Sequence, residues 1–315
     1  MNKKVVILCG GSGSASLLKG LKKFPVDITT VVTVADDGKS TGKLREDFDI
    51  PAIGDLNKVI CNLSDSTPIL EKLLLYRYKN ENYLKNHSVG NLILTALIDI
   101  EGSLSGAVKD LSKVLNVKGN ILPFTDDTVT LVAEMTDGTI VEGEHHITDA
   151  GKVIKELRYK EDVHVLPEVL DEIRNADLII YGIGSLYTSI IPTILSDDMR
   201  KAIIESKAKK MYISNLVTQH GETDGFKVSD CIQVINKYMG GNYLDVVITS
   251  TSLIPENIKQ KYKSQEESVP IVVDYDRLEE MGLEVMSSNL TAIIDELVRH
   301  DSMKTAFEVF SYLMR

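Results

Sequence analysis

Apolar residues in this chain gather in short unbroken runs, each followed by glycine or small polar residues. Val5–Cys9 is apolar at every position and leads directly into the glycine-rich segment Gly10–Ser14. A strand buried on both faces has this pattern, and such strands occur in parallel sheets. Ala15–Lys22 carries leucines at helical spacing, and Ile28–Val34 is a second β-branched run. The chain therefore begins with a predicted β-α-β unit.

The same alternation returns in the second half of the chain. Apolar runs at Leu178–Tyr181, Lys210–Ser214 and Asp245–Thr249 alternate with helical patterns at Met199–Ser206 and Val228–Tyr238. This order predicts an α/β fold with a Rossmann-like, doubly wound and mostly parallel sheet. The other predicted elements are helices at Pro68–Tyr76, Val89–Ile100, Leu104–Leu115 and Met303–Met314, and strands at Val117–Pro123, Val269–Asp274 and Leu283–Met286.

The middle of the chain has a different pattern. Thr128–Met135, Thr139–Gly143 and Lys152–Tyr159 predict antiparallel strands, with a hairpin turn at Asp137-Gly138. We expect a small antiparallel β excursion at about 124–160. Residues 38–66 show little periodicity and are predicted to form a long functional loop with short helical turns. No repeat or linker is evident, so residues 1–315 are predicted to form one domain.

Composition excludes several classes of protein. The chain has 315 residues, with 35 Lys and Arg against 46 Asp and Glu, a net charge of −11. Nonspecific nucleic-acid binding requires a basic face and is not expected. The three cysteines lack metal-ligand spacing and are predicted to be reduced, buried thiols of a cytoplasmic protein. No apolar run approaches the roughly 20 residues of a membrane span, and the amino-terminal run is too short for a signal peptide.

The glycine-rich segment after the first strand suits a phosphate. Glycines allow a tight turn that brings backbone amides close to an oxyanion, and the following helix adds the positive end of its dipole. Ser12 and Ser14 add hydroxyl donors. The third glycine of the dinucleotide fingerprint is absent, so a tight turn without a ligand remains an alternative interpretation.

Acidic and basic residues follow the second strand. Asp36 and Asp37 stand at a strand end, where they could bind ribose hydroxyls or share Mg²⁺ with a phosphate; the alternative is a solvated turn. Lys43, Arg45 and Lys58 could neutralise phosphate, although a solvated loop fits their composition equally well.

Further polar clusters occur along the chain. His87 is a candidate acid, base or ligand contact, and the neighbouring Ser88 could simply cap a helix. Gly182–Ser189 is a second glycine and hydroxyl loop suited to an oxyanion, and Asn215–Thr223 suits sugar or base recognition. His145 and His146 are predicted on an exposed strand with side chains on opposite faces, which disfavours a metal site.

Six motifs taken in order resemble the CofD/YvcK-like family, and within it the YvcK branch of gluconeogenesis factors. These motifs are Gly10–Gly13, Val34–Gly38, Gly54-Asp55, Gly90-Asn91-Leu92, Gly184–Ser189 and Thr218–Thr223. The chain departs from the family pattern at Lys39, where glycine is usual, and at Ile53 and His220, where proline is usual. The arginine that usually precedes Asn57 is also absent. These departures concern the shared catalytic geometry more than the nucleotide site.

The resemblance implies a CofD-like fold and a cytoplasmic factor that binds the nucleotide sugar UDP-GlcNAc. It further implies a role in cell shape and peptidoglycan synthesis during gluconeogenic growth, with protein partners in cell-wall synthesis, and it is compatible with a homo-oligomer. The alternative is a CofD-type transferase that moves a phospholactyl group to a deazaflavin, with Asp37 and Asp55 holding Mg²⁺. A weaker third hypothesis, a dinucleotide-dependent oxidoreductase, depends on the near-fingerprint and Asp36.

No catalytic residue or metal ligand is assigned under the preferred hypothesis. Tyr262 and Arg299 are predicted as nucleotide-sugar contacts from the resemblance alone. The complete set of predicted ligand contacts is Gly10, Gly11, Ser12, Gly13, Ser14, Asp36, Asp37, Asp55, Asn57, Asn91, Gly184, Ser185, Tyr187, Thr188, Asn215, Thr218, Tyr262 and Arg299.

Overall fold

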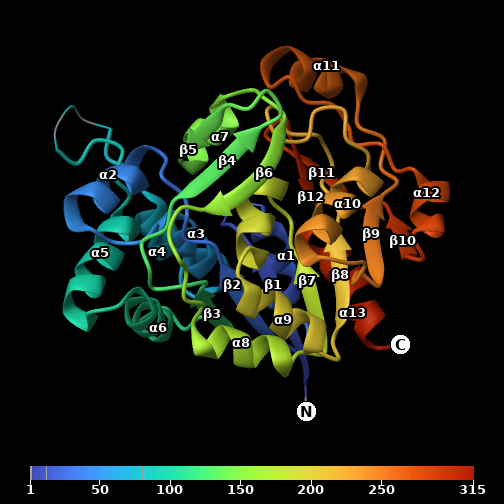
Figure 1. Cartoon of the computed structure of the whole chain (residues 1–315). Coiled ribbons are helices and arrows are strands. Elements are labelled where there is room, and N and C mark those ends of the chain that lie inside the picture. The colour runs from blue at the N-terminus through green and yellow to red at the C-terminus, as the bar shows by residue number, and fades with distance from the viewer. Residues whose placement is uncertain (1, 12, 80, 82) are drawn as a thin grey trace.

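The computed structural model describes residues 2–11, 13–79, 81 and 83–315, and seven strands of this part of the chain form a central sheet (Figure 1). Their order is β10-β9-β8-β7-β1-β2-β3, and every neighbouring pair is parallel. The predicted doubly wound parallel sheet is therefore confirmed. The strands are β1 (Lys3–Cys9), β2 (Val26–Val32), β3 (Asn120–Pro123), β7 (Leu178–Tyr181), β8 (Lys209–Ile213), β9 (Val246–Ser250) and β10 (Glu284–Ser288).

β1 lies inside the sheet, between β7 and β2. Val5–Cys9 of β1 is completely buried, because helices cover both faces of the sheet. From β1 the chain crosses to β2 on one side, whereas β7 leads to β8 on the other side. Right-handed crossovers in opposite directions place α1 (Ala15–Leu21) and α9 (Asp197–Glu205) on opposite faces. The core thus extends along both faces of β1.

Two small antiparallel sheets accompany the central sheet. The first consists of β4 (Leu131–Met135), β5 (Ile140–Glu142) and β6 (Ile154–Tyr159), in the order β5-β4-β6, and confirms the predicted β excursion. The short helix α7 (Glu144–Asp149) connects β5 to β6. The second is the hairpin of β11 (Thr291–Ile294) and β12 (Leu297–His300), which the sequence patterns did not predict.

Three predictions of local structure were wrong. Residues 38–66 contain two helices, α2 (Lys39–Phe48) and α3 (Gly54–Leu63), rather than a loop. α3 buries Asn57 and Asn62 together with its apolar residues, so the polar positions of the segment do not mark a solvent-facing loop. His145 and His146 lie on α7, not on a strand. Val269–Asp274 forms only isolated bridges, because Pro270 cannot donate to a ladder.

The remaining elements lie around this framework. Their helices are α4 (Pro68–Leu75), α5 (Val89–Glu101), α6 (Leu104–Val114), α8 (Pro167–Arg174), α10 (Val228–Met239), α11 (Glu256–Gln265), α12 (Tyr275–Glu280) and α13 (Ser302–Leu313). A π-helical turn η1 (Leu186–Ile190) and a 3₁₀ turn η2 (Ile191–Ile194) follow β7. Cys9, Cys61 and Cys231 are free and buried, as predicted.

Among the described residues, no single helix has the length and apolar content needed to cross a membrane. Only α5 and α6 taken together reach that threshold, and the two are bent by 119° where they join.

The contact between α1 and α13 generates a prediction for stability. A Cβ atom on Gly20 would lie 1.9 Å from the Ser302 carbonyl oxygen and 2.6 Å from Ala306 Cβ. We expect Gly20→Val to force the two helices apart and to lower the free energy of unfolding by about 3 kcal/mol. Urea denaturation measures this change. Lys19→Ala, on the exposed face of α1, is the control and should stay within about 0.5 kcal/mol of the unchanged protein. Equal urea midpoints for Gly20→Val and Lys19→Ala would contradict the tight packing of α1 against α13.

Candidate functional site

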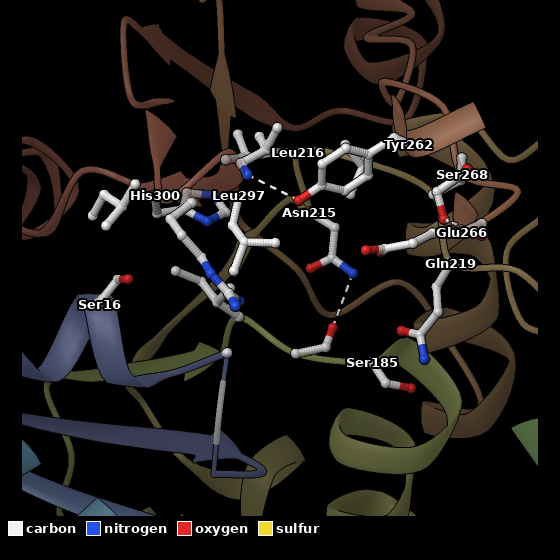
Figure 2. A pocket seen from close by; sticks show the side chains of 18 of the residues that line it. Ser16, Ser185, Asn215, Leu216, Gln219, Tyr262, Glu266, Ser268, Leu297 and His300 are labelled. Carbon is white, nitrogen blue, oxygen red and sulfur yellow. Dashed lines mark hydrogen bonds between the residues drawn. The ribbon is translucent and has the colours of Figure 1, made fainter. Parts of the chain in front are cut away.

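A cleft opens at the carboxyl ends of the central strands. It lies where the chain runs from β1 to one side and from β7 to the other, the position at which open α/β sheets bind ligands. The loops after β1, β7 and β8 meet there with the β11–β12 hairpin and α11, and enclose about 770 Å³ (Figure 2). We call this space the outer cleft. Its polar lining is provided by Ser16, Ser185, Asn215, Thr218, Gln219, Tyr262, Glu266, Ser268, Asp295, Arg299 and His300.

Two glycine loops form the floor of the outer cleft, and their backbones touch. A Cβ atom on Gly13 would lie 2.3 Å from the Ile183 carbonyl oxygen and 2.7 Å from Gly184 Cα. Only glycine fits there, so the loops after β1 and β7 can approach one ligand group together. Ser14 is fully buried, and its Oγ donates to the Gly10 carbonyl oxygen (2.8 Å). Its hydroxyl thus stabilises the loop itself. Ser12 lies outside the described residues.

Hydrogen bonds fix the β11–β12 hairpin against α11 and against the end of β8. The Val298 backbone amide donates to the Tyr262 hydroxyl (2.9 Å), and His300 Nε2 lies 3.1 Å from the Ser214 carbonyl oxygen. Burial lowers the pKa of His300 to about 4, so at neutral pH the uncharged ring donates Nε2–H to that carbonyl. Asn215 Nδ2 donates to the Gly184 carbonyl oxygen (2.9 Å), as Figure 2 shows. The wall of the cleft is thereby joined to its floor.

Arg299 brings a cation to the outer cleft. Its side chain is exposed, and within the described part of the chain no carboxylate pairs with it. A guanidinium offers five N–H donors in a planar fork that matches phosphate oxygens. In a protein of net charge −11, an unpaired arginine beside two glycine loops favours an anionic ligand group.

A smaller polar pocket continues from the outer cleft toward the sheet. It encloses about 280 Å³ and shares Gly13, Gly184, Ser185 and Gln219 with the outer cleft. We call it the inner pocket. Its other lining residues are Thr33, Asp36, Asp55, Lys58, Glu144, Thr188 and Ser189. The only cation among them, Lys58, pairs with Asp55 at 2.9 Å.

Carboxyl groups in the inner pocket repel one another. Burial raises the pKa of Glu144 to about 8, and the charge of Asp36 adds to the effect while a hydrogen bond with Thr188 opposes it. Burial and the charge of Asp55 likewise raise the pKa of Asp36, against a hydrogen bond from the Gly38 amide (2.9 Å). Glu144 is therefore mostly protonated at neutral pH and can both donate and accept a hydrogen bond.

Glu222 stabilises the loop beside both spaces. This buried carboxylate accepts hydrogen bonds from Gln219 Nε2 (2.8 Å), the Tyr187 amide (3.1 Å), Thr188 Oγ1 (3.3 Å), Thr148 Oγ1 (3.3 Å) and Ser185 Oγ. Burial raises its pKa. These donors come from α7, η1 and the loop after β8, so one side chain ties three segments together.

Many of the predicted contacts come together at this edge of the sheet. Those lining the outer cleft or the inner pocket are Gly13, Asp36, Asp55, Gly184, Ser185, Thr188, Asn215, Thr218, Tyr262 and Arg299. Gly10 and Gly11 lie directly behind them, against the Asp55 side chain. Their roles toward a ligand stay predictions.

Other predicted contacts line neither space. Asp37 accepts a hydrogen bond from the His145 amide (2.8 Å), and Tyr187 is buried in the core. Asn57 and Asn91 are buried around the start of α5. Arg45 donates to the carbonyl oxygens of Ala35, Asp36 and Val129, and His87 Nδ1 lies 3.0 Å from Ser40 Oγ. Among the three cations predicted near phosphate, only Lys58 reaches the inner pocket.

The structure also adds residues that are absent from the predicted ligand contacts. Glu144, Gln219 and His300 line the site, and Glu222 supports it. Glu144 lies in the antiparallel excursion, two positions after β5 and far in sequence from the parallel strands of the central sheet, so the rule for parallel strand ends could not find it. Gln219 and Glu222 lie inside the predicted Asn215–Thr223 motif. The motif located the segment, but it did not predict what these two side chains do.

The acidic residues do not fit a metal as they are arranged. Within residues 2–11, 13–79, 81 and 83–315, no three His, Cys, Asp or Glu side chains are grouped to ligate an ion. Asp55 pairs with Lys58, and Asp37 is bonded to the His145 amide. These carboxylates are therefore not arranged to hold Mg²⁺ together, and we derive no reaction step that uses the ion.

The raised pKa of Glu144 predicts how stability changes with pH. An unfolded glutamate loses its proton near pH 4.5, whereas folded Glu144 keeps it to about pH 8. The folded state binds the extra proton, so this group reduces stability progressively as pH rises from about 4.5 to 8. We expect Glu144→Gln to gain on the order of 2 kcal/mol over the unchanged protein by pH 8.

Urea denaturation between pH 5 and 9 measures this difference. Glu279→Gln, which changes an exposed carboxylate on α12, is the control and should show no such trend. If the difference in unfolding free energy between Glu144→Gln and the unchanged protein does not depend on pH, then Glu144 is ionised over this whole range.

Known proteins are similar to this chain along most of its length. The family model described as 2-phospho-L-lactate transferase CofD matches residues 5–291. A protein of Bacillus subtilis named gluconeogenesis factor is 44% identical over 304 residues, which cover 96% of each chain. A gluconeogenesis factor of Listeria innocua is 39% identical over 311 residues, covering 98% of this chain and 95% of the relative.

Solved structures agree with the sequence relatives. A crystal structure of a UPF0052 family protein from Bacillus halodurans superposes with a TM-score of 0.95 at 41% identity, covering 98% of this chain and 99% of that one. The fold and the matched length agree, and the chain belongs to the CofD family.

Proposed function

We propose that this protein binds a nucleotide sugar of the UDP-GlcNAc type and acts as a non-catalytic regulatory factor. The relatives named gluconeogenesis factor support the regulatory part of the proposal. The resemblance to the YvcK branch supports the ligand and a role in cell shape and peptidoglycan synthesis during gluconeogenic growth. Protein partners in cell-wall synthesis would then respond to the bound nucleotide sugar.

The observation that carries the proposal is the unpaired Arg299 beside the two touching glycine loops. Backbone amides near Gly13 and Gly184, together with the guanidinium, supply donors for a diphosphate. The mostly buried Tyr262 side chain forms part of the wall of the outer cleft, where a base can contact it. Asn215, Gln219 and Ser268 offer amide and hydroxyl groups to the base and ribose (Figure 2).

A CofD-type transferase is the second candidate, because the matching family model carries that description. It would need Asp36 or Asp37 with Asp55 to position a phosphate-bound cation. The side chains point to other partners: Asp37 to the His145 amide and Asp55 to Lys58. The regulatory proposal is therefore preferred, and the two are separated by experiment.

Ligand-dependent stabilisation tests the proposal directly. We expect UDP-GlcNAc to raise the melting temperature of the purified protein by several degrees, with the ligand recovered intact, since a ligand stabilises the state that binds it. The parallel samples are UDP, GTP, NAD and the deazaflavin acceptor, each with and without Mg²⁺. A Mg²⁺-dependent shift with GTP or the deazaflavin would favour the transferase instead. A shift with NAD alone would favour an oxidoreductase.

Arg299 provides the matching test by mutation. We expect Arg299→Ala to weaken UDP-GlcNAc binding at least tenfold, since about 1.4 kcal/mol of charge-assisted hydrogen bonding is lost. Calorimetric titration measures the change. Arg277→Ala on α12, which removes an exposed arginine paired with Glu280, is the control and should bind normally. Unchanged affinity in Arg299→Ala would remove the central support of the proposal.

A further inference from the structure

The helix α5 carries apolar side chains on the face that it turns to solvent. Its fully buried residues follow one side of the helix and include Gly90, Asn91 and Leu94. The opposite side has only apolar residues at helical spacing, namely Val89, Leu92, Ile93, Ala96 and Ile100. A helix at the surface of a protein normally has polar residues there, and a helix that is apolar all round is normally covered on every side. One face of α5 therefore lacks the cover that its sequence is suited to.

The neighbouring helix α4 extends this apolar face. Ile69, Leu73 and Tyr76 follow one another at the spacing i, i+4 and i+7 and are 72%, 50% and 51% exposed. The two helices pack against each other and run in opposite directions, because the Val89 amide at the start of α5 donates to the Tyr76 carbonyl oxygen (3.0 Å). They lie on the side of the molecule away from α11 and the β11–β12 hairpin of the outer cleft (Figure 1). We call the surface that they form the helical patch; it consists of Ile69, Leu73, Tyr76, Leu92, Ile93, Ala96 and Ile100.

The helical patch differs from the scattered apolar residues of an ordinary surface. Single exposed apolar side chains are normal, whereas contiguous apolar patches of more than a few hundred Å² mark interaction sites. Ile100 is 72% exposed, as Ile69 is, and no charged residue precedes Asp99 in α5. Within α4 the only charged residue on the exposed side is Lys72. The patch thus has the apolar centre of a protein interface.

Charges of opposite sign stand at the two ends of the helical patch. Arg77 lies beside the start of α5, where it forms an isolated bridge with Ser88, and its guanidinium donates to the Asn86 carbonyl oxygen (2.8 Å). Asp99 lies in the last turn of α5, roughly 15 Å along the helix at 1.5 Å per residue. Within the part of the chain that the structure describes, neither residue forms an ion pair. The dipole of α5 adds to the same polarity.

This distribution of charge matches a second copy of the same surface. A two-fold axis across the helices would set α5 antiparallel to α5 of the other copy. The Arg77 end of each copy would then face the Asp99 end of the other, and the match would occur twice, because both copies use the same patch. An anionic lipid surface would attract one end of the patch and repel the other, in a protein whose net charge is already −11.

We propose that the helical patch is the interface of a symmetric homodimer, in which α5 packs antiparallel to α5 of the partner subunit. Ile69, Leu73, Tyr76 and Ile100 lose their contact with water there, and Arg77 meets the carboxylate at the other end of the partner's helix. This inference does not depend on the proposed function, because the helical patch and the outer cleft share no residue.

Sedimentation velocity of the full chain tests the interface. We expect the unchanged protein to sediment as a dimer at micromolar concentration. Ile100→Lys should raise the dimer dissociation constant at least tenfold, because it places an unpaired charge between the two copies. Leu253→Lys adds the same charge at a residue that is 94% exposed and lies outside α4 and α5, and this control should dimerise as the unchanged protein does. Thermal melting of every variant verifies that it folds.

Two charge reversals test the two-fold arrangement itself. Arg77→Glu and Asp99→Lys each bring like charges together at both ends of the interface, so each variant alone should dimerise several-fold more weakly. An equimolar mixture of the two variants forms a mixed dimer in which opposite charges face each other at both ends. The mixture should regain the affinity of the unchanged protein.

Three results would overturn the proposal. The unchanged protein could sediment as a monomer, or Ile100→Lys could leave its dimer intact. The two charge variants could fail to associate when mixed, which would contradict the antiparallel pairing. Flotation with vesicles of phosphatidylglycerol and phosphatidylcholine covers the other occupant: binding by the unchanged protein that Ile100→Lys abolishes would assign the helical patch to a lipid surface instead.

Discussion

The site depends on the contact between two backbones at the centre of the sheet. Gly13 lies against Ile183 and Gly184 so closely that no side chain could stand between them. This contact exists because β1 and β7 are neighbours, although the loops that follow them are about 170 residues apart in sequence. Parallel pairing places both loops at the same edge. Gly13 and Gly184, the residues of this contact, line both the outer cleft and the inner pocket.

The polar groups around this contact are organised at an energetic cost. Carboxyl groups are held close together in the inner pocket, and burial raises the pKa of Glu144, Asp36 and Glu222. Burying charge is unfavourable unless partners compensate for it. Glu222 accepts hydrogen bonds from five donors, whereas the Glu144 side chain faces the inner pocket with few hydrogen-bond partners. The first carboxylate is a structural support, and the second is placed where a ligand would arrive. Strain of this kind is common at functional sites.

Local patterns predicted most of the framework. The continuous apolar runs gave β1, β2, β7 and β8, and the glycine loops after β1 and β7 were found because they follow such strands. Positions that depend on tertiary packing were missed. The helix α3 buries Asn57 and Asn62 together with its apolar residues, and the β11–β12 hairpin turns on Asp295 and Glu296, two non-glycine residues with positive φ. Arg299 was predicted through family resemblance alone, since its own segment carries no local signal.

The five hydrogen bonds to Glu222 have a mechanical consequence. They join the π-helical turn η1 beneath the ligand cleft to Thr148 at the end of α7, and the excursion that carries α7 reaches the molecular surface (Figure 1). One buried side chain therefore ties the position of η1 to the position of the excursion, and the outer surface of the protein is connected to the cleft by a single residue.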